Sequence, residues 1–467
     1  MKPVRAILIG AGQRGAEAYA PYALKHPNEL KFIAVAEPDE ERRRKFANVH
    51  AIPEKYCFTT WEEIMEQPQL AEAAIITTQD WLHTRPAIAA MERGYHVLLE
   101  KPMATSLEEC QQLIEVSERN QRQLHICHVL RYTQHARKMR EIVQSGVLGE
   151  IIDVDHRENV SFWHMAHSYV RGNWRNSHQS SPMILAKCCH DLDILPWILG
   201  QKPILLSSCG ELTHFRSDKA PINTPERCVD GCPIERECPY SAIHIYIEMQ
   251  PFWHSYRETC TNFFNKAILD AWLKNPALIR NFSRIFPFLR QITDYKGWPL
   301  TVLTQDPTPD KIREALRNGP YGRCVYHCDN NVVDHQVVSM QFQKGTTVTL
   351  TMHGHSHVEH RSTRIEGTRG RLMGVLGNGG GWITVEEHRS RKKLCVDTSP
   401  PTGEGHGGGD SQLMAEFVAQ VRAGGYSDAI KEAAREALFS HYLAFAAEQA
   451  RIEKKVITIN PEEIYSQ

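Results

Sequence analysis

The fold of this chain is decided by residues 5–19, RAILIGAGQRGAEAY. A short apolar run leads into a glycine-rich turn, and a segment with helical character follows. This order of strand, turn and helix N-terminus holds a dinucleotide pyrophosphate on backbone N–H groups and on the positive end of the helix dipole. We expect Gly10 to permit the tight turn, Gly12 to let the backbone approach the phosphates, and Gly15 to let the helix pack closely on the strand.

A second apolar stretch, residues 31–36, ends at Glu37. This is about twenty residues beyond the glycine turn, where dinucleotide-binding domains place the acid that binds the ribose. Because a carboxylate accepts hydrogen bonds from ribose hydroxyls and repels a 2′-phosphate, the sequence favours NAD over NADP. Three nearby arginines, Arg42, Arg43 and Arg44, keep NADP as the open alternative.

Length, charge and cysteine content limit the class of protein. The 467 residues are enough for two domains with separate cores, and the formal net charge of −1 provides no field that would attract nucleic acid or an anionic membrane. No signal-peptide pattern opens the chain and no apolar run is long enough to span a bilayer, so we expect a soluble, cytoplasmic protein. Thirteen cysteines in such a chain fit free thiols or metal ligands better than a disulfide framework.

Residues 1–125 alternate apolar strands with amphipathic segments, which predicts an α/β domain of the Rossmann type with helices on both faces of a parallel sheet. Strands at 73–78 and 96–100 carry polar residues at their carboxyl ends, where such a sheet binds its ligand. Pro102 ends the second of these strands and leaves Lys101 at the sheet edge. The expected cofactor-binding residues are Gly10, Gly12, Gln13, Arg14, Gly15, Glu37, Thr77, Thr78, Asp80, His83, Glu100 and Lys101.

Several motifs together resemble the Gfo/Idh/MocA oxidoreductases, the group of glucose–fructose oxidoreductase and inositol dehydrogenase. They are the glycine turn, Glu100-Lys101-Pro102, Arg131-Tyr132, the turn SGVLGE at 145–150 and His190-Asp191-Leu192-Asp193. The resemblance covers residues 1 to about 205 well and residues 330–467 more loosely. It implies an α+β domain over residues 126–467, with an open, mostly antiparallel sheet that covers the nicotinamide and holds a sugar or polyol. It also implies homodimers or homotetramers.

Hydride transfer from a carbinol needs a base for the hydroxyl proton and positive charge near the developing alkoxide. Lys101 and His190 match the family's catalytic positions, and Lys187, His190 and Asp191 share one face if the segment around them is helical. Many dehydrogenases of the resembling family carry an Asp four residues before this histidine, whereas this chain has Ala186 there. We expect Lys187 to act on the protonation of His190 instead, which makes it a third catalytic candidate.

Residues 162–176, FWHMAHSYVRGNWRN, are dense in aromatic rings and forked donors. Such groups stack on the C–H faces of a sugar and donate hydrogen bonds to its hydroxyls, although an ordinary packed loop is the alternative. A glycine-rich loop at 403–410 precedes a predicted helix at 412–422 with Asp410 as its N-cap, and in the resembling family a loop here closes over substrate. The expected substrate-binding residues are Arg131, Tyr132, His164, His167, Tyr169, Arg171, Trp174, Arg175, Asp191 and His406.

Residues 206 to about 325 form an insertion relative to the shortest members of that family. Cys228, Cys232 and Cys238 lie close together in it with the spacing C-x3-C-x5-C. Three close thiols indicate a structural Zn²⁺ or an iron–sulfur centre, with Cys324 or Cys328 as the fourth ligand. Free structural thiols are the alternative.

These features predict an NAD-dependent enzyme that oxidises a ring hydroxyl of a sugar, glycoside or cyclitol, with no nucleic-acid or membrane partner. Some relatives in the resembling family are NAD-dependent glycoside hydrolases, in which oxidation at C3 acidifies the C2 hydrogen, the aglycone leaves, water adds and the hydride returns. Tyr132, His167, Tyr169 or His406 would supply the additional acid and base. A cofactor-binding regulator without turnover is a third hypothesis.

Overall fold

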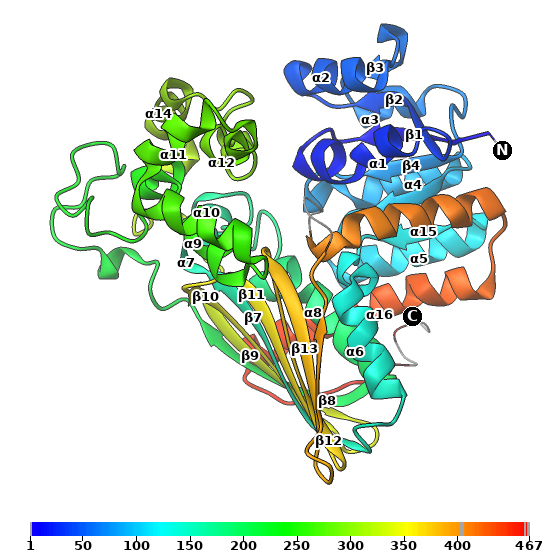
Figure 1. The fold of residues 1–467 in the computed structure, drawn as a ribbon. Helices are drawn as coiled ribbons and strands as arrows, with labels where there is room; N and C mark the ends of the chain where they lie inside the picture. The colour runs from blue at the N-terminus through cyan, green and yellow to red at the C-terminus, as the bar shows by residue number, and fades with distance from the viewer. Residues whose placement is uncertain (1, 401–405, 462–463, 465–467) are drawn as a thin grey trace.

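The computed structural model describes residues 2–400, 406–461 and 464, which form two domains and a helical insertion (Figure 1). The N-terminal domain is built on a six-stranded parallel sheet with the order β3-β2-β1-β4-β5-β6. Its strands are β1 (Val4–Ile9), β2 (Leu30–Ala36), β3 (Cys57–Phe58), β4 (Ala73–Ile76), β5 (His96–Leu99) and β6 (Leu124–Ile126). The predicted Rossmann fold is confirmed.

Helices cover both faces of this sheet, which explains why β4 and β5 are buried along their whole length. Side chains begin several of them: Asp39 caps α2, Thr60 and Glu63 form a capping box on α3, and Ser106 caps α5. The helices are η1 (Gln13–Tyr19, a π-helix), α1 (Pro21–Lys25), α2 (Glu40–His50), α3 (Trp61–Met65), α4 (Thr84–Glu92) and α5 (Leu107–Asn120).

The second domain contains an open nine-stranded sheet with the order β14-β13-β12-β11-β7-β10-β9-β8-β15. Neighbouring strands run antiparallel except β7 and β10, which are parallel. The strands are β7 (Ile151–Ser161), β8 (Pro203–Glu211), β9 (His335–Phe342), β10 (Thr347–Ser356), β11 (His360–Gly367), β12 (Gly370–Gly377), β13 (Gly380–Glu387), β14 (Lys393–Asp397) and β15 (Ile457–Thr458). The expected open, mostly antiparallel sheet is confirmed.

The predicted helix around His190 is confirmed as α8 (Met183–Leu199), which is almost entirely buried. It packs against α6 (Gln134–Gln144) and α16 (Asp428–Glu453) and contacts β10 of the sheet. Before it lie the short helix α7 (Phe162–His164) and the π-helix η5 (Met165–Arg171), so the aromatic segment is mostly helical. The 3₁₀ helix η4 (Val129–Tyr132) joins β6 to α6.

The C-terminal helices return to the N-terminal domain, as Figure 1 shows beside α5. The buried face of α15 (Gly409–Ala423), which includes Phe417, shares a core with β1 and β2. The prediction of Asp410 as the N-cap of this helix is wrong, because Gly408 holds that position and Asp410 lies in the first turn. An acid there still favours the helix dipole.

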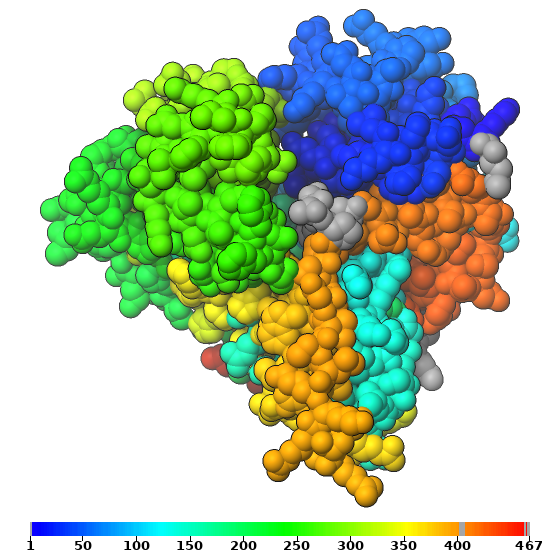
Figure 2. Space-filling view, viewed as in Figure 1, coloured from blue at the N-terminus to red at the C-terminus, as the bar shows by residue number. Residues whose placement is uncertain are grey.

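The insertion begins after β8, at Glu211 rather than at residue 206, and ends before β9. In the space-filling view it faces the N-terminal domain across a narrow hollow (Figure 2). Burial, together with the charge of Glu17 in η1, raises the pKa of Tyr295 in the insertion to about 12. Its helices are η7 (His244–Glu248), α9 (Gln250–Thr259), α10 (Phe263–Lys274), α11 (Pro276–Ser283), α12 (Arg290–Thr293), α13 (Leu300–Leu303) and α14 (Pro309–Asn318).

Within the described part of the chain, no helix combines the length and apolar character needed to cross a bilayer.

Candidate active site

The glycine turn has the geometry that its three glycines predict. Gly10 has a φ of +92°, and a Cβ on Gly15 would stand 2.4 Å from the Gly10 carbonyl oxygen and 2.5 Å from Thr77 Oγ1. Gly12 differs, because a Cβ there would meet nothing within 4 Å. The turn is therefore compact on its inner side and open at Gly12, where a pyrophosphate would approach.

The carboxylate of Glu37 lies beside this turn at the end of β2. Its Oε2 accepts a hydrogen bond from the Ala11 N–H at 2.7 Å, and its Oε1 accepts one from the Asp39 N–H at 3.1 Å. The Arg43 guanidinium donates to the Glu37 carbonyl oxygen at 2.5 Å, so a cation also stands at this strand end. Position and chemistry fit the ribose-binding acid that the spacing predicts.

Two of the predicted cofactor residues follow the turn. Gln13 opens η1 and is exposed. The side chain of Arg14 is directed to protein carboxylates instead: Nη2 is 2.8 Å from Asp410 Oδ1 and Nε is 3.4 Å from Glu100 Oε2. Glu100 also accepts a hydrogen bond from Tyr19 Oη at 2.5 Å. Arg14 and Glu100 thus tie the turn to α15 and to the end of β5.

The polar residues after β4 form hydrogen bonds with backbone carbonyl oxygens of the protein. Thr77 Oγ1 donates to the Gly10 carbonyl oxygen at 2.6 Å, and Thr78 Oγ1 donates to a carbonyl oxygen at 3.0 Å. His83 is fully buried, and its ring nitrogens lie 2.7 Å from the Pro102 carbonyl oxygen and 3.1 Å from that of Thr78. Because both nitrogens contact protein atoms, the expectation that the His83 ring binds cofactor is replaced by a role in supporting the loop of Lys101.

Asp80 joins the two domains rather than presenting a free carboxylate. It is only 3% exposed and accepts hydrogen bonds from Trp174 Nε1 at 3.0 Å, from Ser180 Oγ at 3.1 Å and from Ser181 Oγ at 2.9 Å. These three donors precede α8. Asp80 therefore fixes the start of that helix, and the expectation of direct cofactor contact through its carboxylate is not supported.

Lys101 and the helix of His190 meet at the carboxyl edge of the parallel sheet. The Lys101 ammonium donates a hydrogen bond to the Ala186 carbonyl oxygen at 3.0 Å. Ala186 and His190 are four residues apart on α8, so they lie on one side of the helix one turn apart. The lysine thus contacts the backbone of the position where many dehydrogenases of the family carry an Asp.

Two further histidines border Lys101, and sequence reasoning missed both. The ring of His128 lies 5.6 Å from that of His190 and 5.4 Å from that of His441. Burial and the charges of Arg131 and Lys101 lower the pKa of His128 well below its usual range, and burial lowers that of His441 to about 3. Both rings are therefore neutral at physiological pH. The place of His128 just after β6, at the ligand-binding edge of the sheet, was the available signal.

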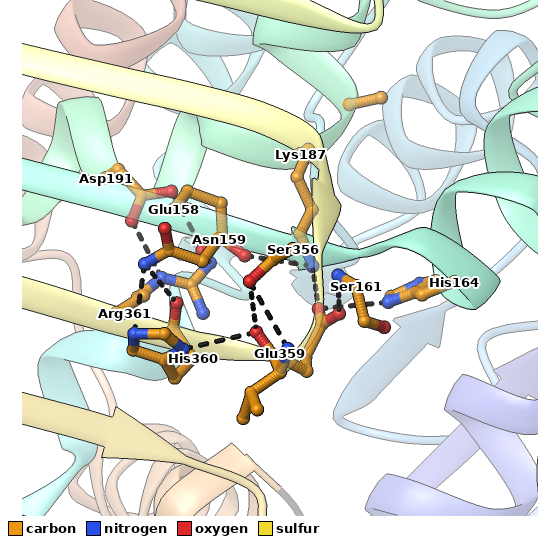
Figure 3. A network of polar contacts seen from close by, with 12 residues as sticks. Glu158, Asn159, Ser161, His164, Lys187, Asp191, Ser356, Glu359, His360 and Arg361 are labelled. Carbon is orange, nitrogen blue, oxygen red and sulfur yellow. Dashed lines mark hydrogen bonds and ion pairs between the residues drawn. The ribbon is translucent and has the colours of Figure 1, made fainter. Parts of the chain in front are cut away.

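Lys187, the residue after Ala186 on α8, belongs to a buried network of charges (Figure 3). Its ammonium lies 2.9 Å from Glu359 Oε1 and 3.3 Å from Glu158 Oε1. His164 Nδ1 approaches the same Glu359 oxygen at 3.0 Å. Two carboxylates thus offset the Lys187 charge, so the expectation that this charge acts on His190 is not supported.

The network continues to Asp191, whose expected role in substrate binding is replaced by ion pairing. Arg361 is 2.7 Å from Asp191 Oδ1 and 2.5 Å from Glu158 Oε2, and His156 Nε2 is 2.9 Å from Asp191. Burial raises the pKa of Glu158, whereas Lys187 and His164 overcome burial to hold that of Glu359 well below its usual range. Three carboxylates face two permanent cations, so a proton on Glu158 would complete the charge balance.

Five of the remaining substrate candidates make contacts within the protein, and their contact with a substrate stays a prediction. Their polar groups bind other parts of the protein, and Tyr132 lies under the Arg137 guanidinium and packs against the core that α15 completes. The other four contacts are Arg131 with Asp193 and Glu436, His167 with Tyr246 Oη, Arg171 with the carbonyl oxygens of Arg323 and Tyr240, and Arg175 with Asp329.

Rings near the charge network remain as candidates for contact with a ligand. His164, Tyr169 and Trp174 form a chain of neighbouring rings, with centroids 6.0 Å and 6.2 Å apart. Trp298 of the insertion lies 5.0 Å from His164 and was missed by sequence reasoning. The side chain of His406 and the loop residues 403–405 lie outside the described residues.

A parallel sheet with a glycine turn, an acid after β2 and a lysine after β5 defines the class: a two-domain protein with a dinucleotide-binding Rossmann domain. Residues 4–128 match the oxidoreductase family with the NAD-binding Rossmann fold, GFO_IDH_MocA, and residues 140–247 match its C-terminal alpha/beta domain. The chain belongs to the Gfo/Idh/MocA family, as its motifs indicate.

Two curated relatives and one solved structure illustrate the range of this family. An inositol 2-dehydrogenase of Leifsonia xyli is 26% identical over 45% of this chain and 57% of its own length. A glycosyl hydrolase family 109 protein of Shewanella pealeana is 26% identical over 32% of this chain and 34% of its own. The aldose-aldose oxidoreductase of Caulobacter crescentus superposes with a TM-score of 0.62 over 98% of this chain and 100% of its own, at 13% identity, which shows the shared fold.

The open side of the glycine turn leads to a prediction. Gly12→Ala should leave the free energy of unfolding within about 0.5 kcal/mol of wild type, because the new methyl group meets no atom and the φ of −75° suits an L-residue. It should weaken NADH binding at least about tenfold, measured by fluorescence titration, since the methyl group occupies the approach to the backbone. Gly15→Ala is the contrasting variant. Its methyl group would clash with the Gly10 carbonyl oxygen, so we expect it to lower the free energy of unfolding. Unchanged NADH affinity in Gly12→Ala would contradict the assignment.

The charge network leads to a second prediction. Lys187→Met should lower the free energy of unfolding by about 3 kcal/mol at pH 7, because it leaves buried carboxylates without their cation. The pKa of Glu359 is held below its ordinary value of 4.5, so this stabilisation is complete above that pH and is lost as the pH falls below it. Urea unfolding between pH 3.5 and 8 should therefore show a difference that shrinks in acid. The exposed Lys344→Met is the control, and a pH-independent difference would contradict the assignment.

Proposed function

We propose that this protein oxidises a ring hydroxyl of a sugar, glycoside or cyclitol with a nicotinamide cofactor. The observation that carries the proposal is the contact of the Lys101 ammonium with the Ala186 carbonyl oxygen, one helical turn before His190. A cation and a histidine at the carboxyl edge of a dinucleotide-binding sheet are the two groups that carbinol oxidation requires of a protein.

NAD is the proposed cofactor. The Glu37 carboxylate would accept hydrogen bonds from the adenosine ribose and would repel a 2′-phosphate. Its present partners, the N–H groups of Ala11 and Asp39, hold it in position without using both lone pairs of each oxygen. Arg43 at the same strand end supports NADP as the second choice.

Each catalytic group has a separate task in this proposal. A bound nicotinamide supplies an acceptor for the hydride of the carbinol carbon. The Lys101 ammonium would stabilise negative charge on the substrate oxygen, and His190 would remove the hydroxyl proton. His128 and His441 are positioning residues, because the ring of His128 lies beside those of His190 and His441, and His441 Nε2 accepts a hydrogen bond from the Met103 N–H at 2.8 Å.

A redox-cycling glycoside hydrolase is the second candidate function, and the charge network favours it. Elimination and hydration need an acid and a base beyond Lys101 and His190, and Glu359 with His164 and Lys187 forms such a set on the next face of α8. The similarity to a protein named as a glycosyl hydrolase supports the same class. His167 is a weaker choice for this role than the sequence indicates, because its ring stacks on Tyr321 and contacts Tyr246 Oη.

Substrate assays distinguish the two candidates. Chromogenic α- and β-glycosides, free sugars and inositols are incubated with the protein, with and without NAD, while NADH absorbance and aglycone release are followed together. We expect stoichiometric NADH without aglycone release, because net hydride transfer leaves the glycosidic bond intact. Aglycone release without net NADH would replace the dehydrogenase by the glycoside hydrolase. If no compound in the panel yields NADH or free aglycone, that result would contradict both candidate functions.

Variants of the two central residues test their roles. Lys101→Met and His190→Asn should each lower kcat by about 10²–10⁴-fold on the best substrate of that panel, because each removes one of the groups that act on the substrate oxygen. Fluorescence titration should show that NADH still binds, and the exposed Lys344→Met should match wild type. Full activity in either catalytic variant would overturn its assignment.

A further inference from the structure

Four thiols of the insertion come together outside the proposed active site. Cys228, Cys232, Cys238 and Cys324 line one pocket, together with Arg171. Of the two alternatives that the sequence left open for the fourth position, the structure brings Cys324 to the pocket. The thiol of Cys328 instead donates to the Cys324 carbonyl oxygen at 3.3 Å.

Backbone pairing explains how residues almost a hundred positions apart reach one pocket. The Cys228 N–H donates to the Gly322 carbonyl oxygen at 2.9 Å, and the Cys324 N–H donates to the Glu226 carbonyl oxygen at 2.8 Å. These two bonds form an antiparallel bridge at Arg227. The loop that joins Cys228 to Cys232 turns back through Gly231, whose φ is +78°.

Arg171 supplies an independent sign that a negatively charged group belongs in this pocket. Its guanidinium is completely buried and donates to the carbonyl oxygens of Arg323 and Tyr240, both at 2.7 Å, and to Cys228 Sγ at 3.5 Å. Among the described residues its Nη1 has no hydrogen-bond partner, and the groups that raise its pKa are cysteines and Tyr246 rather than carboxylates. A buried cation is costly without a counter-charge, and neutral thiols do not provide one.

The surrounding chain has little regular secondary structure. Residues 212–243 consist mainly of turns and bends, interrupted by the short 3₁₀ helix η6 (Ser217–Lys219). Segments of this kind are commonly stabilised by a bound metal ion.

We propose that Cys228, Cys232, Cys238 and Cys324 bind one structural Zn²⁺ as a four-thiolate centre, whose negative charge Arg171 offsets in part. Each thiol loses one proton when the metal binds, so four thiolates and Zn²⁺ carry a net charge of −2 beside the guanidinium. Among the described residues, no three His, Cys, Asp or Glu side chains stand in a coordinating arrangement, so the thiols must turn inward on binding. The site is separate from the proposed active site and does not depend on the reaction assigned there.

Metal analysis of the full-length chain tests the proposal. The protein is purified without chelators under reducing conditions, titrated with Zn²⁺, freed of excess metal and measured by inductively coupled plasma mass spectrometry. About one zinc per chain is expected. Titration with a mercurial reagent, with a chromogenic zinc indicator present, should release that zinc as four thiols react.

Matched cysteine variants locate the site. Cys228→Ser and Cys324→Ser should lose the zinc, whereas Cys209→Ser and Cys395→Ser, which change exposed cysteines elsewhere, should retain it. Arg171→Met keeps all four thiols and should weaken zinc retention about 10–100-fold, measured by competition with a chelator. Because Arg171→Met keeps all four zinc ligands, its zinc affinity tests the proposal even if a cysteine variant does not fold.

Three results would overturn the proposal. Iron with inorganic sulfide and broad visible absorption would replace zinc by an iron–sulfur cluster. A chain that takes up no zinc under reducing conditions would exclude the centre. Zinc retained in full by both Cys228→Ser and Cys324→Ser would place the metal elsewhere.

Discussion

The packing of α8 against the sheet of the second domain depends on buried ion pairs. Asp191 pairs with Arg361, and Lys187 pairs with Glu158 and Glu359, so one helix is joined to β7 and to the start of β11. Each partner alone would be a costly buried charge, so the ion pairs must form together. The position of His190, which lies on this helix, follows from that requirement. The same ion pairs therefore stabilise the packing of α8 and set the position of His190.

The two domains are held together by polar contacts around the same helix. Asp80 binds the segment that enters α8, Lys101 binds its backbone, and Arg14 binds Asp410 of the C-terminal helix α15. Hydrogen bonds have strict distances and angles, so these contacts fix the sheet edge relative to α8 more closely than apolar packing would. An active site assembled from two domains needs this precision, because a small displacement of a reacting group costs much of the rate.

The segment 162–176 shows where inference from residue types fails. Rings, histidines and arginines at this density fit a sugar site, yet Arg171 and His167 attach the insertion, and Arg175 binds a surface carboxylate. The same forked donors and flat apolar faces that recognise a polyol also satisfy carbonyl oxygens and pack against other rings. A side chain's chemistry therefore does not reveal whether its partner is a ligand or the protein itself. Asp80 and His83 likewise contact protein groups.

The sequence by itself determined the Rossmann domain, the turn at Gly10, the acid at Glu37, the lysine at a strand end and the helix of His190. These features are encoded locally, in hydrophobic period, glycine position and proline stops, so a short window contains the whole signal. Only the tertiary structure decided that Lys187 faces carboxylates, that His128 and His441 border Lys101, that α15 returns to the first domain, and that Cys324 rather than Cys328 joins the thiol pocket. Each of these contacts joins residues distant in sequence, and their meeting depends on how whole helices and sheets pack.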